Sequence, residues 1–313
     1  MSEIFTLQEI LSDADAYRSV GDAHTAVEVL LAGLDQFADP MATGRISDAL
    51  AQLCASFGAS GEFARGEEIT GMVVKHALQR AGKTVEPEFA AIYSRALVAT
   101  RSSVFPMRRI YRHRNLWHLF GQISPGSRGD VVECGCAAGL SFIELCLAFS
   151  GGRAEWAGEG FHVFDSFEGL SEPCAEDFNL GEAGENAALI AANLVRGNFA
   201  VPFDVVRESV HRFFPKAQLH RGWIPDVFAG QPERTYRFVH LDVDLYQPTL
   251  DSLNYFMPRL AEGGAIVTDD YNWPGARQAF QEYCALHRLE VHCTDTSQAF
   301  VIKGSCPDSL KWR

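Results

Sequence analysis

Apolar residues in the first part of the chain recur every three or four positions, which is the spacing of one face of an α-helix. Two segments of this region resemble each other, residues 14–34 and residues 50–73. Each places a small-residue turn, Gly21-Asp22 or Gly61-Glu62, between two stretches of helical spacing. The pattern therefore predicts a pair of helical hairpins similar to tetratricopeptide repeats.

The predicted helical region forms residues 1–88, with residues 82–88 as the link to a second domain at residues 89–313. Two interpretations of the hairpins stay open. They form a module for partner binding or self-association, or they form a cap over the apolar surface of the second domain. Two imperfect repeats are fewer than a free solenoid needs, so a cap or a dimer contact is favoured.

Beyond residue 100 the pattern changes to strands that alternate with helices, which predicts a mostly parallel sheet covered on both faces. The expected strands are residues 131–134, 161–164, 203–206, 237–241 and 265–268. The expected helices follow the first strand and occupy residues 186–196, 249–260 and 275–286.

The last two expected strands, residues 289–293 and 298–302, are separated by four residues. This connection is too short for a parallel crossover, so the two strands must form an antiparallel hairpin. The predicted fold class is α/β: a parallel sheet that ends in an antiparallel hairpin, preceded by an all-α hairpin domain. Such a sheet resembles the Rossmann-like plan of class I S-adenosylmethionine-dependent methyltransferases.

Residues 130–149 read as a buried strand, a glycine turn and a helix, which is typical of a nucleotide-like ligand site. Gly135 and Gly139 remove Cβ atoms where the backbone has to pass close to a ligand. The spacing lacks the G-x-G-x-x-G of a dinucleotide site, and Glu133 would repel a pyrophosphate. The turn is therefore expected to bind a cationic or neutral nucleoside.

Each strand end carries an acid, and ligands of open α/β sheets bind at the carboxyl ends of strands. Asp165 ends the second strand, where a carboxylate can accept two hydrogen bonds from a ribose diol. The alternative for Asp165 is an N-cap or Asx turn before Glu168.

Four more acids follow the fourth and fifth strands: Asp242, Asp244, Asp269 and Asp270. Carboxylates crowded at one edge repel one another unless a cation lies between them, and magnesium prefers oxygen ligands. We expect Asp242, Asp269 and Asp270 to hold Mg²⁺. Asp244 would support the site or cap the next helix. The alternative for the pair at 269–270 is a solvated turn before Pro274.

Composition limits the partners. The 313 residues include 27 basic and 40 acidic side chains, with 47% hydrophobic content and a formal net charge of −13. This charge repels phosphate backbones and anionic lipid, so we expect neither nucleic acid nor a membrane as a partner. The eight cysteines lie mostly in apolar segments without zinc-type spacing, as reduced core residues would. Without a spanning apolar run or a signal layout, a cytoplasmic location is expected.

Three blocks of the sequence together resemble one family over residues 100–302. They are GDVVECGCAAGLS, FDSFEGLSEP and HLDVDLYQPTLDSLNYFMPRLAEGGAIVTDDY. They are similar to the macrocin O-methyltransferase (TylF/MycF-type) family, whose members are magnesium-dependent and mostly methylate sugar hydroxyls of natural products. The resemblance implies S-adenosylmethionine and Mg²⁺ as cofactors and a hydroxyl acceptor, a sugar or a glycosylated natural product.

The resemblance also implies the site residues. They are Glu133, Gly135, Gly139 and Ser141 around the methionine part, Asp165 and Ser166 at the ribose, and Asp242, Asp269 and Asp270 at the metal. Residues 105–119 resemble a helical lead-in that closes over the cofactor. Two departures stand out. Glu208-Ser209 occupies the place expected for a Gly-Trp pair after the third strand, and the N-terminal helical region lies outside the common pattern.

Methyl transfer to oxygen needs a nucleophile in line with the S–CH₃ bond, and a divalent cation lowers the pKa of a hydroxyl. Asp242 is the expected catalytic residue and proton acceptor. A nearby histidine or water is the alternative, with His113, His118, His211 and His240 as candidates that otherwise are ordinary packed or surface imidazoles.

Substrate contacts are expected near the metal acids. Tyr246, Tyr271, Asn272 and Trp273 follow these acids, and their aromatic rings would stack on the acceptor or plug the core. The segment Glu172–Glu185 is expected to be a mobile loop over the acceptor. We also expect a homo-oligomer, formed through the N-terminal helices.

Two other classes of protein fit parts of the pattern. The sequence Asp242-Val243-Asp244 is also typical of glycosyltransferases that use sugar nucleotides and of phosphatases with an aspartate nucleophile. Both would need phosphate-binding groups, which the turn at Glu133 does not offer. The third alternative is a scaffold with a relic methyltransferase fold, against which the intact acids at the strand ends argue.

Overall fold

The computed structural model describes residues 5–102, 109–123, 128–151, 153, 155–179, 181, 187–304 and 310. The chain forms two compact units, residues 1–114 and residues 115–313. Helix α5 (Pro87–Thr100) packs against α3 and α4 and so belongs to the first unit. The contacts place the boundary between the units after residue 114, later in the chain than the boundary after residue 88 that the sequence predicts. The division into independent domains stays a prediction.

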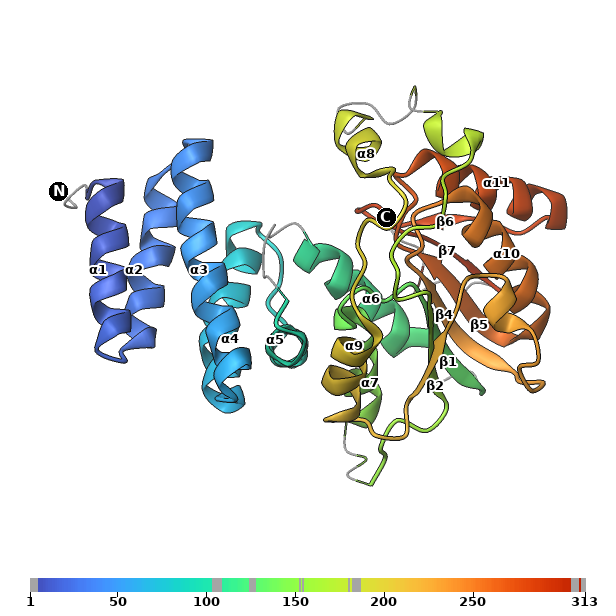
Figure 1. Ribbon diagram of the computed structural model, residues 1–313, viewed down its shortest axis with the longest axis horizontal. Helices are drawn as coiled ribbons and strands as arrows, with labels where there is room; N and C mark the ends of the chain where they lie inside the picture. The colour runs from blue at the N-terminus through green and yellow to red at the C-terminus, as the bar shows by residue number, and fades with distance from the viewer. Residues whose placement is uncertain are drawn as a thin grey trace. The chain divides into compact units, whose positions relative to one another are not determined.

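The first unit is helical, as its apolar spacing predicts (Figure 1). Its other helices are α1 (Leu7–Ser19), α2 (Ala23–Gln36), α3 (Pro40–Ser60) and α4 (Phe63–Arg80). Asp22 caps α2 by accepting a hydrogen bond from the Thr25 amide, and Gly61 ends α3 in the left-handed conformation that glycine tolerates. The two predicted helical hairpins are therefore present, α1 with α2 and α3 with α4.

The second unit is built on a seven-stranded sheet in the order β3-β2-β1-β4-β5-β7-β6. Its strands are β1 (Asp130–Cys134), β2 (Phe161–Asp165), β3 (Gln218–Arg221), β4 (Tyr236–Leu241), β5 (Leu260–Thr268), β6 (His292–Cys293) and β7 (Ala299–Ile302). The first five strands pair in parallel, whereas β7 is antiparallel to both β5 and β6. This confirms the predicted fold class, a parallel sheet with a C-terminal antiparallel hairpin.

Helices cover both faces of this sheet (Figure 1). They are α6 (Arg109–Ile123), α7 (Leu140–Ser150), α8 (Ala187–Asn193), α9 (Phe203–His211), α10 (Tyr246–Phe256) and α11 (Pro274–His287), with 3-10 turns at Ala175–Phe178, Asp226–Phe228 and Met257–Arg259. One face of the sheet packs against α10 and α11 in a single apolar cluster. On the other face, Phe120 of α6 and Phe142 of α7 contact the ring of Phe161. Alternate residues of each strand therefore face different helices.

One predicted strand was wrong. Residues 203–206 begin helix α9, in which Val206 and Val210 lie one turn apart and are buried. The third strand is Gln218–Arg221, an edge strand with polar and partly exposed residues. Leu219 is the single apolar residue of this short strand, so the apolar pattern did not reveal it. Gly222-Trp223 follows this strand directly, so the expected departure at Glu208-Ser209 disappears.

The cysteines largely match their prediction. All seven in the described part of the chain are free thiols, and five are buried: Cys54, Cys134, Cys136, Cys146 and Cys284. Cys293 is exposed and Cys306 lies outside the described residues. None of the described helices combines the length and the apolarity that a membrane crossing requires.

Candidate active site

Backbone hydrogen bonds continue the sheet past the ends of its strands and bring the predicted site residues to one edge. The amide of Asp242 donates to Cys134 O at 2.9 Å, and the amide of Asp269 donates to Leu241 O at 2.9 Å. The amide of Gly135 donates to Phe164 O at 2.9 Å. The acids that follow β4 and β5 therefore lie beside the glycine turn after β1.

Gly135 is required by the protein itself. Its φ is +75°, and a Cβ atom there would lie 1.9 Å from the carbonyl oxygen of Asp242. A Cβ at Gly135 would therefore meet the protein's own backbone after β4, and the expected contact of Gly135 with a ligand stays a prediction. Gly139 differs, since its added Cβ would meet only Val206 and Val210 at ordinary distances of 3.5 and 3.6 Å. Gly139 begins α7 with a φ of +86°.

Asp165 is positioned by two backbone amides. Its Oδ2 accepts a hydrogen bond from Cys136 N at 2.7 Å, and its Oδ1 accepts one from Phe167 N at 2.6 Å. The second bond is the Asx turn that was the alternative interpretation of this residue. The first ties the end of β2 to the glycine turn. Ser166 bonds within its own loop, donating to Gly169 O and accepting from the Glu168 amide.

Left-handed backbone conformations of non-glycine residues gather at these strand ends. Ala137 lies in the glycine turn with a φ of 44°, Phe167 follows Asp165 with 57°, and Asp244 follows β4 with 59°. Such conformations are unfavourable for side chains with a Cβ and persist where the surrounding structure enforces them. Their clustering is typical of a functional site.

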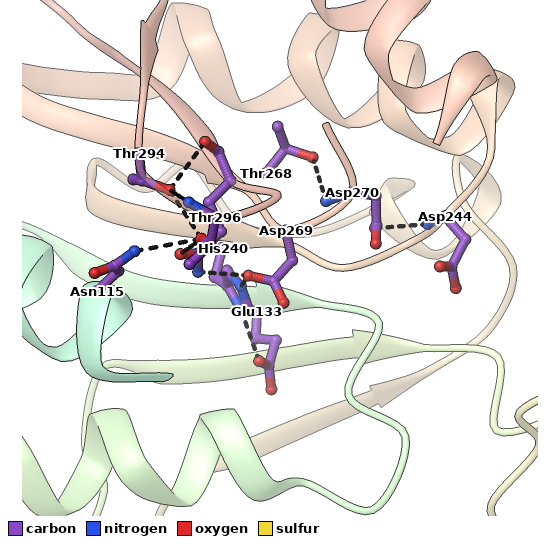
Figure 2. A network of polar contacts seen from close by, with 10 residues as sticks. Asn115, Glu133, His240, Asp244, Thr268, Asp269, Asp270, Thr294 and Thr296 are labelled. Carbon is purple, nitrogen blue, oxygen red and sulfur yellow. Dashed lines mark hydrogen bonds and ion pairs between the residues drawn. The ribbon is translucent and has the colours of Figure 1, made fainter. Parts of the chain in front are cut away.

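The acids after β4 and β5 separate into two groups (Figure 2). Asp242, Asp244 and Asp270 each offer a carboxylate oxygen within 4.8 Å of the others. The Asp244 amide also donates to Asp270 Oδ2 at 2.9 Å. Asp242 and Asp270 of the predicted metal set thus lie together, joined by Asp244. That Asp242, Asp269 and Asp270 together hold Mg²⁺ stays a prediction.

Asp269 points toward a different group of side chains (Figure 2). Its Oδ1 accepts a hydrogen bond from Gln298 Nε2 at 2.6 Å and lies 3.4 Å from His240 Nε2. The other ring nitrogen of His240, Nδ1, lies 2.9 Å from Glu133 Oε1. Successive residues at a strand end face opposite sides, which explains why Asp269 and Asp270 diverge.

The environment of His240 is unusual for a histidine. Burial by itself lowers the pKa of the imidazole, but hydrogen bonds and charge from Asp269 and Glu133 outweigh it and raise the pKa well above its ordinary value. The carboxylates on both sides of His240 therefore favour the charged form of its imidazole. Sequence reasoning named His240 as one of four candidate bases, without the role that its neighbours give it.

The other candidate histidines make ordinary contacts. His113 stacks near Tyr93 at 4.8 Å between ring centroids, and His118 lies beside Trp117 at the same distance. His211 Nε2 lies 3.1 Å from Ala217 O. These contacts fit the alternative interpretation, in which the three histidines are ordinary packed or surface imidazoles.

The aromatic residues after the acids are mostly structural. Tyr271 OH accepts a hydrogen bond from Gln281, and Tyr246 OH donates to Glu282 at 2.7 Å, so α11 holds both hydroxyls. Trp273 packs against a small apolar cluster under α8, composed of Leu170, Ile190, Leu194 and Leu245. Among these three aromatic residues, Trp273 is the one that joins the acid loops to the segment between β2 and α9.

The described part of the predicted loop Glu172–Glu185 is anchored. Asp177 is buried and its Oδ1 accepts a hydrogen bond from the Tyr246 amide at 2.8 Å. Its Oδ2 accepts another from the Cys174 amide at 2.8 Å. Residues 180 and 182–186 lie outside the described residues.

Sequence reasoning missed two buried side chains of the site. Gln298 of the β6–β7 hairpin contacts Asp269, and Asn115 of α6 donates to Asp295 Oδ1 at 2.9 Å and to Thr296 Oγ1 at 3.3 Å. Both are nearly inaccessible to solvent. The sequence offered no signal for either residue, because Asn115 lies in a helix rich in polar residues and Gln298 lies in the loop between β6 and β7.

The reversed β7, the glycine turn after β1 and the acids after β2, β4 and β5 define a class I methyltransferase. The chain belongs to the macrocin O-methyltransferase (TylF) family, whose model matches residues 103–301. This confirms the resemblance seen in the sequence and leaves the N-terminal helices α1 to α5 outside the match.

Curated relatives agree with the family. The chain is 32% identical over 168 residues to the 8-demethyl-8-(2,3-dimethoxy-alpha-L-rhamnosyl)-tetracenomycin-C 4'-O-methyltransferase of Streptomyces olivaceus, covering 51% of this chain and 60% of the relative. It is 29% identical over 184 residues to the mycinamicin III 3''-O-methyltransferase of Micromonospora griseorubida, covering 57% and 69%. The chain thus spans about 60% of the length of the first of these relatives.

A solved structure shares the fold. The O-methyltransferase NovP aligns with a TM-score of 0.52 at 23% sequence identity, over 63% of this chain and 81% of that one. At this identity the comparison bears on the fold and not on the substrate.

Proposed function

We propose that this protein is an S-adenosylmethionine-dependent and magnesium-dependent O-methyltransferase that acts on a hydroxyl of a sugar or of another small natural-product acceptor. The observation that carries the proposal is the meeting of Asp242, Asp244 and Asp270 within 4.8 Å beside the glycine turn. Family membership and relatives named for methylation of natural-product sugars support it.

The glycine turn and the end of β2 fit the cofactor. Asp165 is held by two amides beside the turn, where its remaining acceptor capacity suits the two ribose hydroxyls. Glu133 is buried, and its Oε2 has no hydrogen-bond partner among the described residues. A buried carboxylate oxygen of this kind suits a cationic group, such as the amino group of the methionine part. Ser141 lies in the first turn of α7, where the free amides of a helix N-terminus favour an anionic group such as the carboxylate of the methionine part.

The acid cluster fits a hard divalent cation. Three carboxylates this close repel one another, and an oxygen-preferring ion between them removes that repulsion. Asp242 and Asp270 belong both to the set expected from the sequence and to the set that the geometry groups. The bound ion would lower the pKa of the acceptor hydroxyl.

The protein's own groups supply position and a proton acceptor. Asp242 lies between the glycine turn and the acid cluster, because its backbone bonds to Cys134 and closes over Gly135. S-Adenosylmethionine bound at the turn would supply the methyl group, and Asp242 would hold the acceptor hydroxyl beside it. We propose that the Asp242 carboxylate orients this hydroxyl and accepts its proton.

The test is titration of the full chain by calorimetry, first with S-adenosylhomocysteine and then with a UDP-sugar. Binding of the first without the second supports the proposal, and binding of the UDP-sugar alone rejects it in favour of a glycosyltransferase. Mass spectrometry of glycosylated acceptors, with S-adenosylmethionine and magnesium, should then detect a methylated product. Asp270→Asn should lose this activity, whereas the exposed Asp226→Asn should keep it.

The third metal ligand can be identified by comparing two variants. Affinity for Mn²⁺, read by electron paramagnetic resonance, should fall in Asp244→Asn if the geometric grouping holds the ion. It should fall in Asp269→Asn if the set expected from the sequence does so through the second oxygen of Asp269. An unchanged affinity in Asp242→Asn and Asp270→Asn would reject the metal site itself.

We further propose that the N-terminal helices mediate self-association. Support comes from their position outside the residues that the family model matches. Light scattering of the full chain tests this directly. A monomer at all concentrations would reject it.

A further inference from the structure

Three ionisable side chains lie in a buried row on one face of the sheet, beside the glycine turn. Glu133 Oε1 lies 2.9 Å from His240 Nδ1, and His240 Nε2 lies 3.4 Å from Asp269 Oδ1. The side chains of Glu133 and His240 are 0% and 1% exposed, and that of Asp269 is 8% exposed. An imidazole therefore lies between two carboxylates in a region that solvent barely reaches.

Sheet register holds this row in place. Glu133 of β1 and His240 of β4 are direct partners in the parallel ladder, so their side chains emerge next to each other on the same face. Asp269 follows β5, and its amide bonds to Leu241 O of the neighbouring strand. The row therefore crosses three adjacent strands at their carboxyl ends.

The hairpin before the C-terminus fixes the far end of the row. Gln298 Nε2 donates to Asp269 Oδ1 at 2.6 Å, and Gln298 Oε1 accepts a hydrogen bond from Thr296 Oγ1 at 3.0 Å. The second bond sets the direction of the amide, because its oxygen is engaged by a donor. At the near end, Glu133 Oε2 lies two residues before Gly135 and has no hydrogen-bond partner among the described residues.

The two ends of the row therefore belong to different ligands of the proposed reaction. Glu133 ends the strand that leads into the cofactor turn, whereas Asp269 directly precedes Asp270 of the acid cluster. An imidazole that contacts two buried carboxylates fixes the orientation of both, and its removal leaves each carboxylate without this partner.

We infer that His240 is a positioning residue that links the cofactor side of the site to the metal side, so that cofactor and divalent cation bind cooperatively. The inference rests on the proposed function. When the cofactor engages Glu133, the Glu133–His240–Asp269 row becomes more rigid, and the backbone at Asp269-Asp270 is held in the arrangement that receives the ion. By linkage, the ion strengthens cofactor binding by the same factor.

The experiment measures Mn²⁺ affinity of the full chain with and without saturating S-adenosylhomocysteine. Wild-type protein should bind Mn²⁺ about tenfold more tightly with the cofactor product present, within the usual range of coupling between sites. His240→Gln should bind both ligands with affinities that no longer depend on each other. Its kcat should fall more than its KM for S-adenosylmethionine changes.

His162→Gln is the matched control. His162 is also 1% exposed and also contacts a carboxylate, at 3.0 Å from Asp130, but it lies near the amino end of β2 and on the opposite face of the sheet. A general packing defect would affect both variants, whereas loss of coupling should appear only in His240→Gln.

A second variant keeps the test decisive if His240→Gln does not fold. Glu133→Gln preserves the shape of the row while removing one charge, and it should abolish the coupling from the cofactor side. Coupling that survives in Glu133→Gln or His240→Gln overturns the inference, as does independent binding of the two ligands by wild-type protein. If wild-type protein binds neither ligand, the proposed function itself fails, so the two failures are distinguishable.

Discussion

Two polar clusters, each with a buried histidine, occupy opposite ends of the same sheet and differ in their electrostatics. At the carboxyl ends, His240 lies between Glu133 and Asp269, and its pKa is raised well above the ordinary value. At the amino ends, His162 lies between Asp130 and His220, with 3.2 Å between the nearest imidazole nitrogens. There, burial together with the charges of His162 and Arg234 lowers the pKa of His220 to about 4.

Burial alone therefore does not decide the direction in which the pKa of a histidine shifts. Hydrogen bonds and charge from two acids raise the pKa of His240 despite its burial, whereas burial and nearby positive charges lower the pKa of His220. Arg234 Nη1 donates to Asp130 Oδ2 at 3.0 Å, so the negative charge at the amino end is already balanced. Among the described residues, Arg234 Nε at the amino end and Glu133 Oε2 at the carboxyl end are buried without a hydrogen-bond partner.

The largest expected effect is the loss of the His240 imidazole. His240→Leu leaves Glu133 and Asp269 buried without their partner and should destabilise the fold by about 3–5 kcal/mol. His162→Leu should destabilise it by about 1–3 kcal/mol, because Asp130 keeps Arg234. Urea denaturation of both variants measures the difference. Equal losses would mean that the two clusters do not differ in the way described.

Substitution of the glycine beside the carboxyl-end cluster should also destabilise the fold more than substitution of the glycine beside the amino-end cluster. Gly135→Ala places a Cβ 1.9 Å from a backbone oxygen and should cost about 3 kcal/mol or more. Gly160→Ala places a Cβ 2.9 Å from Asp130 Oδ1, a side-chain atom that can move, and should cost about 1 kcal/mol. Thermal melts of the two variants compare them. A smaller loss of stability in Gly135→Ala than in Gly160→Ala would contradict the close approach of the Asp242 carbonyl oxygen to Gly135.

Acid sensitivity should depend on the amino-end cluster. The folded-state pKa of His220, about 4, lies below its usual 6.5, so the unfolded chain takes up more protons than the folded protein between these values. Stability should therefore fall as the pH drops from 6.5 toward 4, and His220 contributes no such loss above this window. Since His220 is only half-buried, its share should be about 1–2 kcal/mol after screening. His220→Gln should flatten this part of the stability profile, and a profile identical to that of wild-type protein would contradict the assignment.

The smallest effect should come from Arg234→Gln. The variant removes one partner of Asp130 and a charge that lowers the pKa of His220. The loss of stability at neutral pH should be less than about 1 kcal/mol, because the pair is partly exposed. Titration of the His220 ring by NMR should show its pKa move upward toward 6.5. A downward movement would reject the role of this arginine.

Much of the sheet was predictable from local pattern, and the exception has a physical cause. Val131, Val132 and their counterparts in β2, β4 and β5 form apolar runs because strands buried on both faces have no polar side. The edge strand β3 lacks this constraint, and the short apolar turn of α9 was read as a strand in its place. A buried helix segment and a buried strand cannot be told apart over four residues.

The sequence predicted which acids lie at the site better than it predicted where their side chains point. Strand ends that carry Asp165, Asp242 and Asp269 had to meet at one edge, and they do. The contacts of Gln298 and Asn115 arise between segments far apart in the chain, so no local pattern contains them. The assignment of individual acids to cofactor and metal stays a prediction, as do the oligomer and the cytoplasmic location.

The apolar cluster under α8 has a practical consequence for protein engineering. Leu245 directly follows Asp244, and Trp273 lies three residues after Asp270; both pack against Ile190 of α8 and its neighbours. In a chimaera that receives only the α8 segment of a relative, the new helix would have to pack against Leu245 and Trp273, which follow the acids of the two loops. Grafts intended to widen the range of acceptors should therefore transplant residues 242–245 and 270–273 together with that helix.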